Sequence, residues 1–305
     1  MASIESRAVR DMYLGWTAAR IKGEQLDNES WGNLTAEPGA VDYLEFEIGG
    51  MRAMWAVPAE RDDGRALLWF HGGGFISGGI YSHRKLCGHL AKAIGARVLN
   101  FEYRLLPEGV HPVPVDDAIV AYRWLLAQGF EPANIAFGGD SAGGGLAITA
   151  QSQAREHGLP LPAAALLLSP WVDMEVSTDS FSTNWANDAF FYRELVLALA
   201  NGFLGPDGDP RDPLANPLHA DLAGLAPTCI QVGGHETLLD ECRALAGRLS
   251  DAGVETRFEA FEEQQHTFQM AAGKAPEADD AIRKLAEWVR PRLGLTTLAS
   301  AAVIA

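Results

Sequence analysis

The sequence predicts an α/β protein in which a mainly parallel sheet carries helices on both faces. Short apolar runs alternate with longer amphipathic runs over residues 66–293, the pattern of parallel strands joined by helices. A Gly139-x-Ser141-x-Gly143 turn stands where one expected strand passes into one expected helix. Two earlier strand-like runs are joined by Gly49-Gly50, which predicts a hairpin ahead of the parallel part.

Each element follows from its local pattern. An amphipathic run over 8–22 predicts the first helix, in an N-terminal arm of residues 1–40 that could fold over a pocket. The other helices are expected at 83–94, 115–128, 142–157, 241–249 and 277–293. Strands are expected at 43–48, 51–57, 66–70, 97–101, 134–137, 163–168, 228–232 and 255–261. The main domain should span residues 41–295, and the small, apolar tail of 296–305 is expected to be disordered.

Residues 171–217 interrupt this alternation. The segment is rich in aromatic residues and ends in a cluster of Pro, Gly and Asp. A long insertion of this kind is typical of a lid or cap over a pocket. The alternative is a satellite hydrophobic cluster, and some of the rings must belong to one.

Composition excludes several classes of function. The chain has 305 residues, of which 48% are hydrophobic, and this is ample for one sizeable core. A formal net charge of −16 argues against nucleic acid and against stable association with an anionic membrane. The three cysteines, Cys87, Cys229 and Cys242, are too scattered for a disulfide framework or a metal cluster, so buried, reduced thiols are expected. A secretory leader and an apolar run of membrane-spanning length are both missing, which predicts a cytoplasmic protein.

Ser141 is the candidate nucleophile. The Gly-x-Ser-x-Gly spacing at a strand-to-helix joint forms a sharp turn that strains the serine backbone, and the flanking glycines avoid clashes with neighbouring chain. The turn holds the hydroxyl at a helix N-terminus, where free N–H groups favour an anion. An ordinary glycine-rich loop is the simpler alternative, but the strand before it and the helix after it favour catalysis.

A serine hydroxyl needs a base, and His266 is the best placed of the eight histidines. It follows the last expected strand, at the sheet edge where Ser141 emerges. The acid should follow the preceding strand, in a loop that holds Glu236 and Asp240. Glu236 is the expected acid, although it could instead cap a helix, and Asp240 is expected to supply a supporting hydrogen bond. His235 precedes the acid in the chain and is expected to be a bystander.

Acyl transfer also needs donors for the oxygen that becomes negative. The backbone N–H groups of the Gly72-Gly73-Gly74 loop and of Ala142 suit this role, since no side chain blocks their approach. A phosphate-binding loop is the alternative, but the Lys-Ser/Thr and G-x-G-x-x-G contexts are missing.

Taken together, these motifs resemble the hormone-sensitive-lipase-like family of α/β-hydrolases, above all the bacterial carboxylesterases of its GDSAG branch. The resemblance covers nearly the whole chain and implies an α/β-hydrolase fold, with an eight-stranded, mostly parallel sheet and a helical cap made of the N-terminal arm and the insertion. It implies Ser141 as nucleophile, His266 as base, the N–H groups of Gly73, Gly74 and Ala142 as the oxyanion hole, and His71 as a brace for the glycine loop. The motifs that carry it are His71-Gly72-Gly73-Gly74-Phe75, Gly139-Asp140-Ser141-Ala142-Gly143-Gly144, the Tyr103–Glu108 loop and His266.

The chain departs from the family at the acid. The family usually has Asp-Pro-Leu-x-Asp where this chain has Glu236-Thr237-Leu238-Leu239-Asp240. Alignment on Leu238 and Asp240 puts Glu236 at the catalytic position, whereas a shifted loop would put Asp240 there.

The resemblance therefore implies a serine hydrolase that cleaves carboxylic esters of short to medium acyl chains, without a metal or an organic cofactor. A small apolar ester or lactone is the expected substrate. Hydrolysis of ε-lactones and an arylformamidase or amidase activity are the alternatives, and a non-catalytic receptor would lack the histidine base. Members of the family are often dimers, so a homodimer is a candidate assembly. The pocket is expected to include Phe75, Trp171, Trp185 and Trp16.

Overall fold

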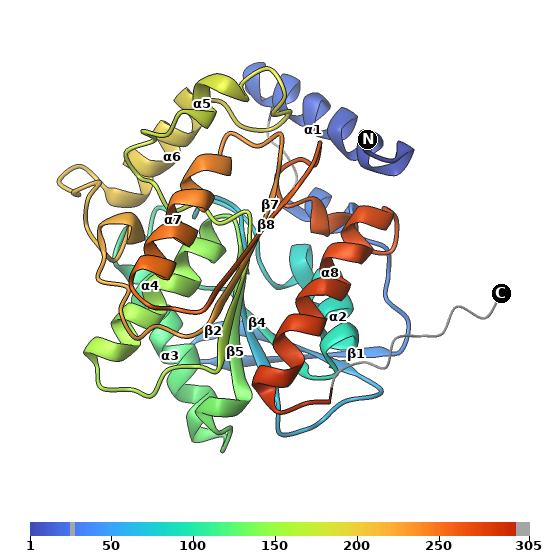
Figure 1. The fold of residues 1–305 in the computed structure, drawn as a ribbon, viewed down its shortest axis with the longest axis vertical. Coiled ribbons are helices and arrows are strands. Elements are labelled where there is room, and N and C mark those ends of the chain that lie inside the picture. The colour runs from blue at the N-terminus through green and yellow to red at the C-terminus, as the bar shows by residue number, and fades with distance from the viewer. Residues whose placement is uncertain (25–27, 297–305) are drawn as a thin grey trace.

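The computed structural model describes residues 1–24 and 28–296 and has three layers, with one sheet between two groups of helices (Figure 1). Within these residues the sheet has eight strands in the order β1-β2-β4-β3-β5-β6-β7-β8. β2 pairs antiparallel with β1 and with β4, and the other neighbours pair in parallel, so the predicted sheet is confirmed. The strands are β1 (Val41–Ile48), β2 (Met51–Pro58), β3 (Ala66–Phe70), β4 (Arg97–Phe101), β5 (Ile135–Asp140), β6 (Ala164–Leu168), β7 (Thr228–Gly233) and β8 (Thr256–Phe261).

Helices cover both faces of the sheet and one of its ends. In Figure 1, α3, α4 and α7 lie on one side, α2 and α8 lie on the other, and α1, α5 and α6 lie across the end of the sheet. The α-helices are α1 (Ile4–Ile21), α2 (Ile80–Ile94), α3 (Val113–Ala127), α4 (Ala142–Glu156), α5 (Ser180–Thr183), α6 (Arg193–Leu204), α7 (Leu239–Asp251) and α8 (Pro276–Val289). Short 3₁₀ helices occupy Asn28–Asn33, Pro132–Asn134, Pro217–His219, Phe268–Ala271 and Arg290–Leu293.

Some element boundaries differ from the prediction for local reasons. The first helix begins at Ile4 rather than at residue 8, because the side chain of Ser3 accepts a hydrogen bond from the backbone N–H of Ser6 and caps the helix. The last α-helix ends at Val289, two residues before Pro291, and continues as a 3₁₀ turn. The strand before the Gly-x-Ser-x-Gly turn runs on to Asp140, so β5 delivers the chain directly to Ser141.

The central strands of the sheet are completely buried. Every residue of β3, β5 and β6 is buried, as expected for parallel strands covered on both faces. Full burial of one Leu or Phe side chain contributes about 1.5–3 kcal/mol, so these strands fix the position of the loops that leave them. The three cysteines are buried free thiols.

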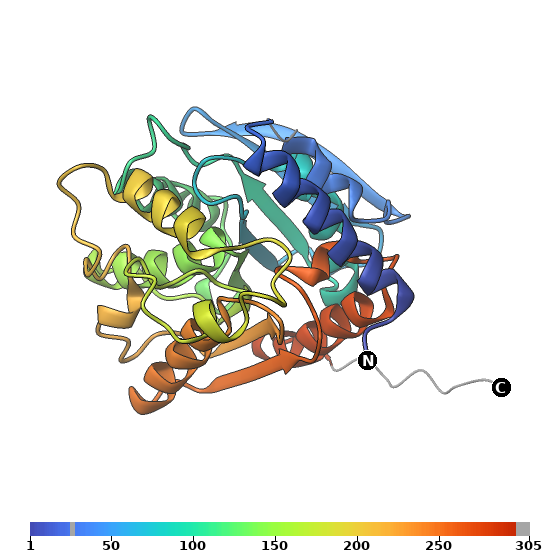
Figure 2. The ribbon, with the colours of Figure 1, turned by 90° about the horizontal axis from the view of Figure 1, so that it is seen from above.

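The N-terminal helix is tied down at both ends. Near its start, Ser6 Oγ lies within hydrogen-bonding distance of Gln264 Oε1 (3.0 Å) and Glu277 Oε2 (2.8 Å). Near its end, Thr17 Oγ1 donates to Ala189 O at 2.8 Å, in the insertion before α6. Figure 2 shows α1 and α6 on either side above the end of the sheet. The arm and the insertion therefore meet over the edge where the site lies.

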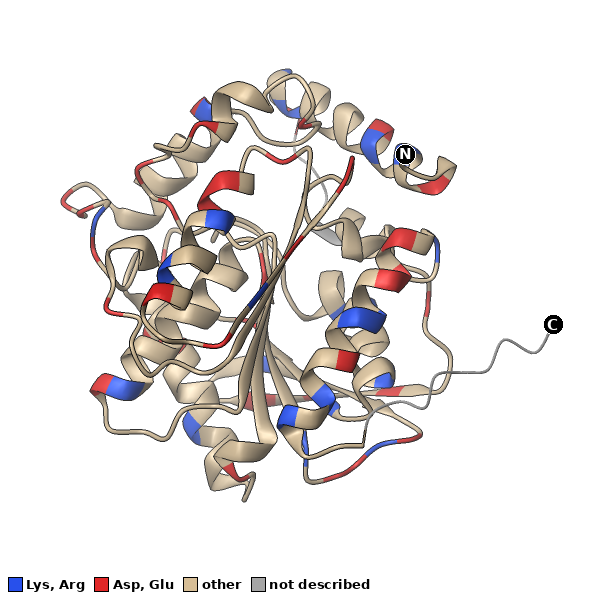
Figure 3. Cartoon of the chain, viewed as in Figure 1, with Lys and Arg blue, Asp and Glu red and all other residues tan. Residues whose placement is uncertain are grey.

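Charged residues lie mainly on the helices and loops that surround the sheet (Figure 3). Of the expected tail 296–305, residues 297–305 lie outside the described residues. In the part of the chain that the structure describes, no helix combines the length and the apolar character needed to cross a membrane.

Candidate active site

The candidate nucleophile Ser141 lies between β5 and α4 with φ 53° and ψ −123°. A side chain carbon added to Gly143 would lie 1.9 Å from the carbonyl oxygen of Phe70, and one added to Gly139 would lie 2.3 Å from the carbonyl oxygen of Gly143. Both flanking glycines are therefore required by close backbone contacts. A left-handed serine costs about 1–3 kcal/mol, and the buried strands around it hold it in place.

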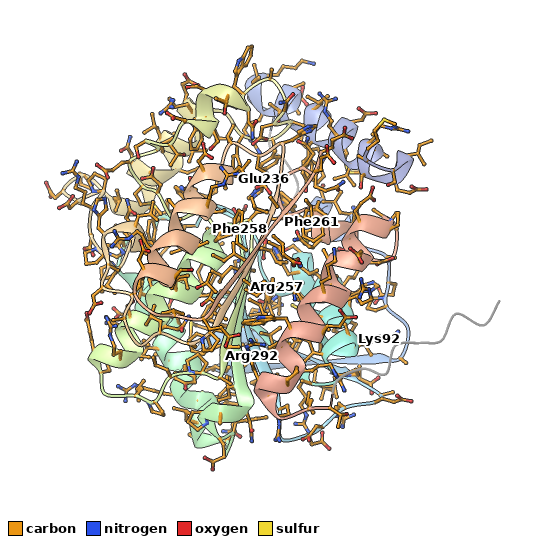
Figure 4. All side chains as sticks on the ribbon, viewed as in Figure 1. Lys92, Glu236, Arg257, Phe258, Phe261 and Arg292 are labelled. Atoms are coloured by element: carbon orange, nitrogen blue, oxygen red, sulfur yellow. The ribbon has the colours of Figure 1, made fainter. Side chains whose placement is uncertain are left out.

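His266 and Glu236 form a buried pair beside this turn. His266 Nδ1 lies 2.7 Å from Glu236 Oε2, and both side chains are 2% exposed or less. Glu236 Oε1 also accepts hydrogen bonds from Ser169 Oγ (2.6 Å) and from Gly233 N–H (2.5 Å), which fix the carboxylate. Figure 4 shows Glu236 at the end of the sheet that faces α5, where the loops after β7 and β8 meet. Since Nδ1 is engaged, Nε2 is the ring nitrogen left for the serine.

Asp240 is placed away from the base. It lies in the first turn of α7, its side chain is 30% exposed, and it pairs with Arg243 one turn further on. The carboxylate that contacts His266 is therefore that of Glu236, as the alignment on Leu238 predicts. The Asp240 carboxylate therefore does not make the expected supporting hydrogen bond to the acid, and its backbone N–H donates to Ser180 Oγ at 3.1 Å.

The glycine loop presents free donors to the same place. Gly73 and Gly74 have φ of 123° and 63°, and Gly73 O accepts hydrogen bonds from Ile76 N–H and Ser77 N–H, which close a tight turn. Within residues 1–24 and 28–296, the backbone N–H groups of Gly73, Gly74 and Ala142 donate to no protein acceptor. An anion beside Ser141 would satisfy them.

A buried carboxylate that the sequence analysis did not single out braces this loop. Asp140 Oδ1 accepts from Gly72 N–H at 3.0 Å, and Oδ2 lies 3.2 Å from His83 Nε2. Burial would raise the pKa of Asp140, but the nearby His83 and His71 and the Gly72 N–H together lower it. Asp140 belongs to the Gly139–Gly144 motif. His83, on α2, could not be predicted to lie here, because only the fold brings it to the glycine loop.

His71 lies beneath the glycine loop, as the resemblance implied. Its ring stacks on Tyr103 with 4.3 Å between centroids, and Nδ1 lies 2.8 Å from Gly72 O. Burial, together with the neighbouring His83, lowers the pKa of His71 to about 3. The ring is thus neutral at pH 7 and donates from Nδ1 to the carbonyl of Gly72.

One cavity joins these groups. Its volume is about 440 Å³, and Ser141, His266, Gly73 and Gly74 line it. Its apolar wall comes mainly from the N-terminal part of the chain and from the insertion, with Trp31, Ile76, Phe190, Phe191, Leu195 and Leu199. The structure thus brings the proposed nucleophile, base and donors together at an apolar pocket. His235, the expected bystander, lines a different hollow beside the start of α1.

The prediction of the pocket residues was wrong. None of the four expected side chains lines this cavity: Phe75, Trp171, Trp185 and Trp16. Phe75 stacks on Phe203 at 3.8 Å and contacts Trp171 in the core. Trp185 points to solvent and is 70% exposed. Trp16 packs behind Trp31, with 5.2 Å between ring centroids. Aromatic content indicates an apolar wall, but the direction of each ring depends on the packing of the cap.

Comparison with known proteins agrees with this geometry. Residues 67–270 match a family described as alpha/beta hydrolase fold. An acetyl-hydrolase of Streptomyces hygroscopicus is 39% identical over 301 residues, which cover 96% of this chain and 99% of that protein. An esterase of Acinetobacter venetianus is 32% identical over 248 residues, which cover 81% of this chain and 82% of that protein.

Solved structures give the same answer. An esterase from the bacterial hormone-sensitive lipase family has a TM-score of 0.91 at 39% identity, covering 96% of this chain and 100% of that one. EstE5, soaked by p-nitrophenyl butyrate, has a TM-score of 0.89 at 32% identity with the same coverage. The fold and these relatives make the chain a member of the α/β-hydrolase family. Within that family it is a hormone-sensitive-lipase-like carboxylesterase.

Proposed function

We propose that the protein hydrolyses carboxylic esters with short to medium acyl chains, using Ser141 as nucleophile, His266 as base and Glu236 as acid. The observation that carries this proposal is the buried hydrogen bond of 2.7 Å between Glu236 and His266, the histidine that lines the same cavity as Ser141. A strained serine, a buried imidazole–carboxylate pair and free backbone donors are the parts that acyl transfer needs.

In the first step, Ser141 Oγ forms a bond to the ester carbonyl carbon while His266 Nε2 takes the hydroxyl proton. The carbonyl oxygen becomes negative and accepts hydrogen bonds from the N–H groups of Gly73, Gly74 and Ala142. Glu236 holds the ring in the tautomer with Nδ1–H and stabilises the imidazolium that forms. The alcohol then leaves with the proton from His266.

In the second step, His266 takes a proton from water, and the resulting hydroxide attacks the acyl carbon bound to Ser141. The acyl–oxygen bond to the serine breaks, the proton returns to Ser141, and the carboxylic acid is released. Every proton passes through one imidazole, so the chain's own residues complete the cycle. The rings of Phe190 and Phe191 pack against the His266 ring, with 6.0 and 4.6 Å between ring centroids. They limit the access of water to the imidazole.

The cavity limits the acyl chain. Its 440 Å³ lies toward the lower end of the range of about 300–1,000 Å³ that is usual for small-molecule sites. Its walls are mostly aromatic and aliphatic, which suits a small apolar ester. A cytoplasmic location and a homodimer are further parts of the proposal, and they rest on the sequence alone.

Hydrolysis of p-nitrophenyl esters from acetate to palmitate tests the proposal, with Ser141→Ala and the matched surface variant Ser182→Ala in parallel. We expect turnover of the short esters, a decline well before palmitate, and a loss of about a thousandfold or more in kcat for Ser141→Ala alone. Matched amides and lactones should be slower. A folded protein that turns over none of the esters would contradict the proposal and bring lactones and formamides forward.

A further inference from the structure

The cavity contains a charge that the proposed reaction does not use. Arg20, in the last turn of α1, lines the cavity together with Ser141 and His266. Among the described lining residues, Arg20 is the one side chain with a permanent positive charge. The triad, the oxyanion donors and the braces of the glycine loop all work without it. A guanidinium group in a mostly apolar pocket therefore calls for a role of its own.

Arg20 is held in place, but most of its donors have no acceptor among the described residues. Its Cζ lies 4.7 Å from the centroid of the Phe190 ring, a cation–π contact. Within residues 1–24 and 28–296, its one hydrogen bond is a long one, from Nη1 to Phe190 O at 3.4 Å. Over the described residues it makes no ion pair with a carboxylate. A guanidinium group has five N–H donors, so several remain for a ligand.

Because Arg20 is half-buried, water screens its charge less, and it attracts an anionic ligand more strongly. Burial lowers the pKa of Arg20, and nearby Tyr192 acts in the opposite direction. The group stays protonated at neutral pH in either case, because arginine does not lose its proton in proteins. A partly desolvated cation that has no carboxylate partner among the described residues gains more from an anion than an exposed one does.

The path from the reacting centre to Arg20 is short. The Phe190 ring contacts the His266 ring, with 6.0 Å between centroids, and the same ring contacts the Arg20 guanidinium. No more than one aromatic side chain therefore separates the base from the cation. An acyl chain bound at Ser141 and running along Phe190 would bring its far end to Arg20.

Other charges face the same cavity and must be weighed. The carboxylate of Asp140 already accepts a hydrogen bond from Gly72 N–H and lies 3.2 Å from His83 Nε2. Glu24 also lines the cavity, but it is exposed, so water and salt screen its repulsion of an anion. Figure 3 shows basic and acidic residues together along α1, so the helix as a whole is not a cationic surface. The attraction for an anion is thus local to Arg20.

We propose that Arg20 is an anion-binding subsite of the ester-binding cavity, and that the preferred substrates are esters whose acyl group ends in a carboxylate. This proposal rests on the proposed esterase function and specifies its substrate class. The planar fork of the guanidinium group matches the two oxygens of a carboxylate. A methyl-ended chain of the same length would leave those donors unsatisfied.

The test compares pairs of 4-nitrophenyl esters that differ only at the far end: the adipate half-ester with the hexanoate, and the suberate half-ester with the octanoate. The measured quantity is the ratio of kcat/KM for the carboxylate-ended ester to kcat/KM for its methyl-ended partner, after subtraction of uncatalysed hydrolysis. In Arg20→Gln this ratio should fall by about tenfold, the effect of losing one charge-assisted contact. Arg20→Lys should retain part of the ratio, and added salt should lower it in the wild type.

Two further variants, one in α1 and one just after it, test whether the effect is specific to Arg20. Arg7→Gln removes an exposed arginine near the other end of α1 and should leave the ratio unchanged. Glu24→Gln removes an exposed, screened opposing charge, so it should raise the ratio only slightly and chiefly at low salt. A merely structural role of Arg20 predicts that both esters of a pair slow equally and that the ratio stays constant. That outcome overturns the proposal.

Binding to Ser141→Ala separates this proposal from the esterase proposal. Calorimetric titration of that variant with the adipate half-ester, with and without Arg20→Gln, needs no turnover. Binding about tenfold weaker in the double variant supports the subsite even if no ester is hydrolysed. Equal binding overturns the subsite, whereas a wild type inactive on every ester, methyl-ended and carboxylate-ended alike, contradicts only the esterase function.

Discussion

The hydroxyl of Tyr13 donates a hydrogen bond of 3.0 Å to the main-chain carbonyl of His266, and so joins the first helix to the loop that carries the proposed base. Tyr13 is fully buried. The loop itself is strained, since Glu263 and Thr267 both have positive φ, of 58° and 46°. Contacts from outside hold it in this shape. The N-terminal helix therefore acts as a brace for the histidine loop as well as a wall of the cavity.

Removal of this hydrogen bond should slow catalysis more than it weakens substrate binding. In Tyr13→Phe the His266 carbonyl stays buried without its donor, at a cost of about 1–3 kcal/mol in the free energy of unfolding. Because the loop can then shift, we expect kcat to fall about three- to tenfold with little change in KM. Steady-state kinetics with p-nitrophenyl butyrate and urea unfolding measure the two effects.

Tyr81→Phe is the matched control, because Tyr81 is 40% exposed and its hydroxyl bonds to Glu45 at the surface. It should keep wild-type kcat and nearly all of the stability. If Tyr13→Phe were as active as Tyr81→Phe, α1 would be a wall only and not a brace.

The choice of acid gives a second prediction. Glu236→Gln preserves shape but leaves an amide facing His266 Nδ1, which allows the wrong ring tautomer, so kcat should drop by about two orders of magnitude or more. Asp240→Asn loses only a surface ion pair with Arg243 and should retain activity within about twofold. Parallel kinetics of the two variants decide the matter. Reversed effects would show that the loop shifts in solution and that Asp240 is the acid.

Two glycines should respond in opposite ways to the same change. Gly143→Ala would put a methyl group 1.9 Å from Phe70 O in the backbone of the central sheet, so little folded protein is expected. Gly247 lies inside α7 with no atom near a new methyl group, so Gly247→Ala should raise the free energy of unfolding by about 0.5–1 kcal/mol. Yield of soluble protein and thermal melting distinguish them. A stable, active Gly143→Ala protein would mean that the turn is looser than these contacts imply.

Much of the fold could be predicted because its signals are local. The expected strands 66–70 and 97–101 match β3 and β4 residue for residue. β3 is apolar throughout, as a strand buried on both faces requires. The proposed nucleophile Ser141 could be found because its strained turn requires glycines at fixed spacing. The proposed base His266 and acid Glu236 followed from their places after the last two strands.

The parts that could not be predicted depend on packing between distant segments. Trp31 lines the cavity and Trp16 lies behind it, although the two residues are equally aromatic and come from the same arm. His83 reaches Asp140 across 57 residues, and Arg20 enters the cavity only because α1 lies against Phe190. Which face of a cap element meets the cavity depends on tertiary contacts that leave no periodic mark in the sequence.

The buried His71 should make stability depend on pH. In the folded protein its pKa is lowered to about 3 from an ordinary 6.5, chiefly by burial and then by His83, while Asp140 acts in the opposite direction. Between these two values the unfolded chain binds a proton that the folded chain does not. The contribution of His71 to the free energy of unfolding should therefore be complete above about pH 6.5. It should be lost progressively as the pH drops toward 3.

His71→Asn tests this dependence. Asparagine cannot titrate, yet its amide can still donate to the Gly72 carbonyl that His71 Nδ1 contacts at 2.8 Å. Urea unfolding at a series of pH values below 6.5 should show a slope lower than that of the wild type by up to about 1.4 kcal/mol per pH unit. Asp140 and His83 remain in both proteins, so their own titration does not account for the difference. Equal slopes would mean that His71 takes up its proton in the folded protein near its ordinary pKa, and that the glycine loop tolerates a charged ring beneath it.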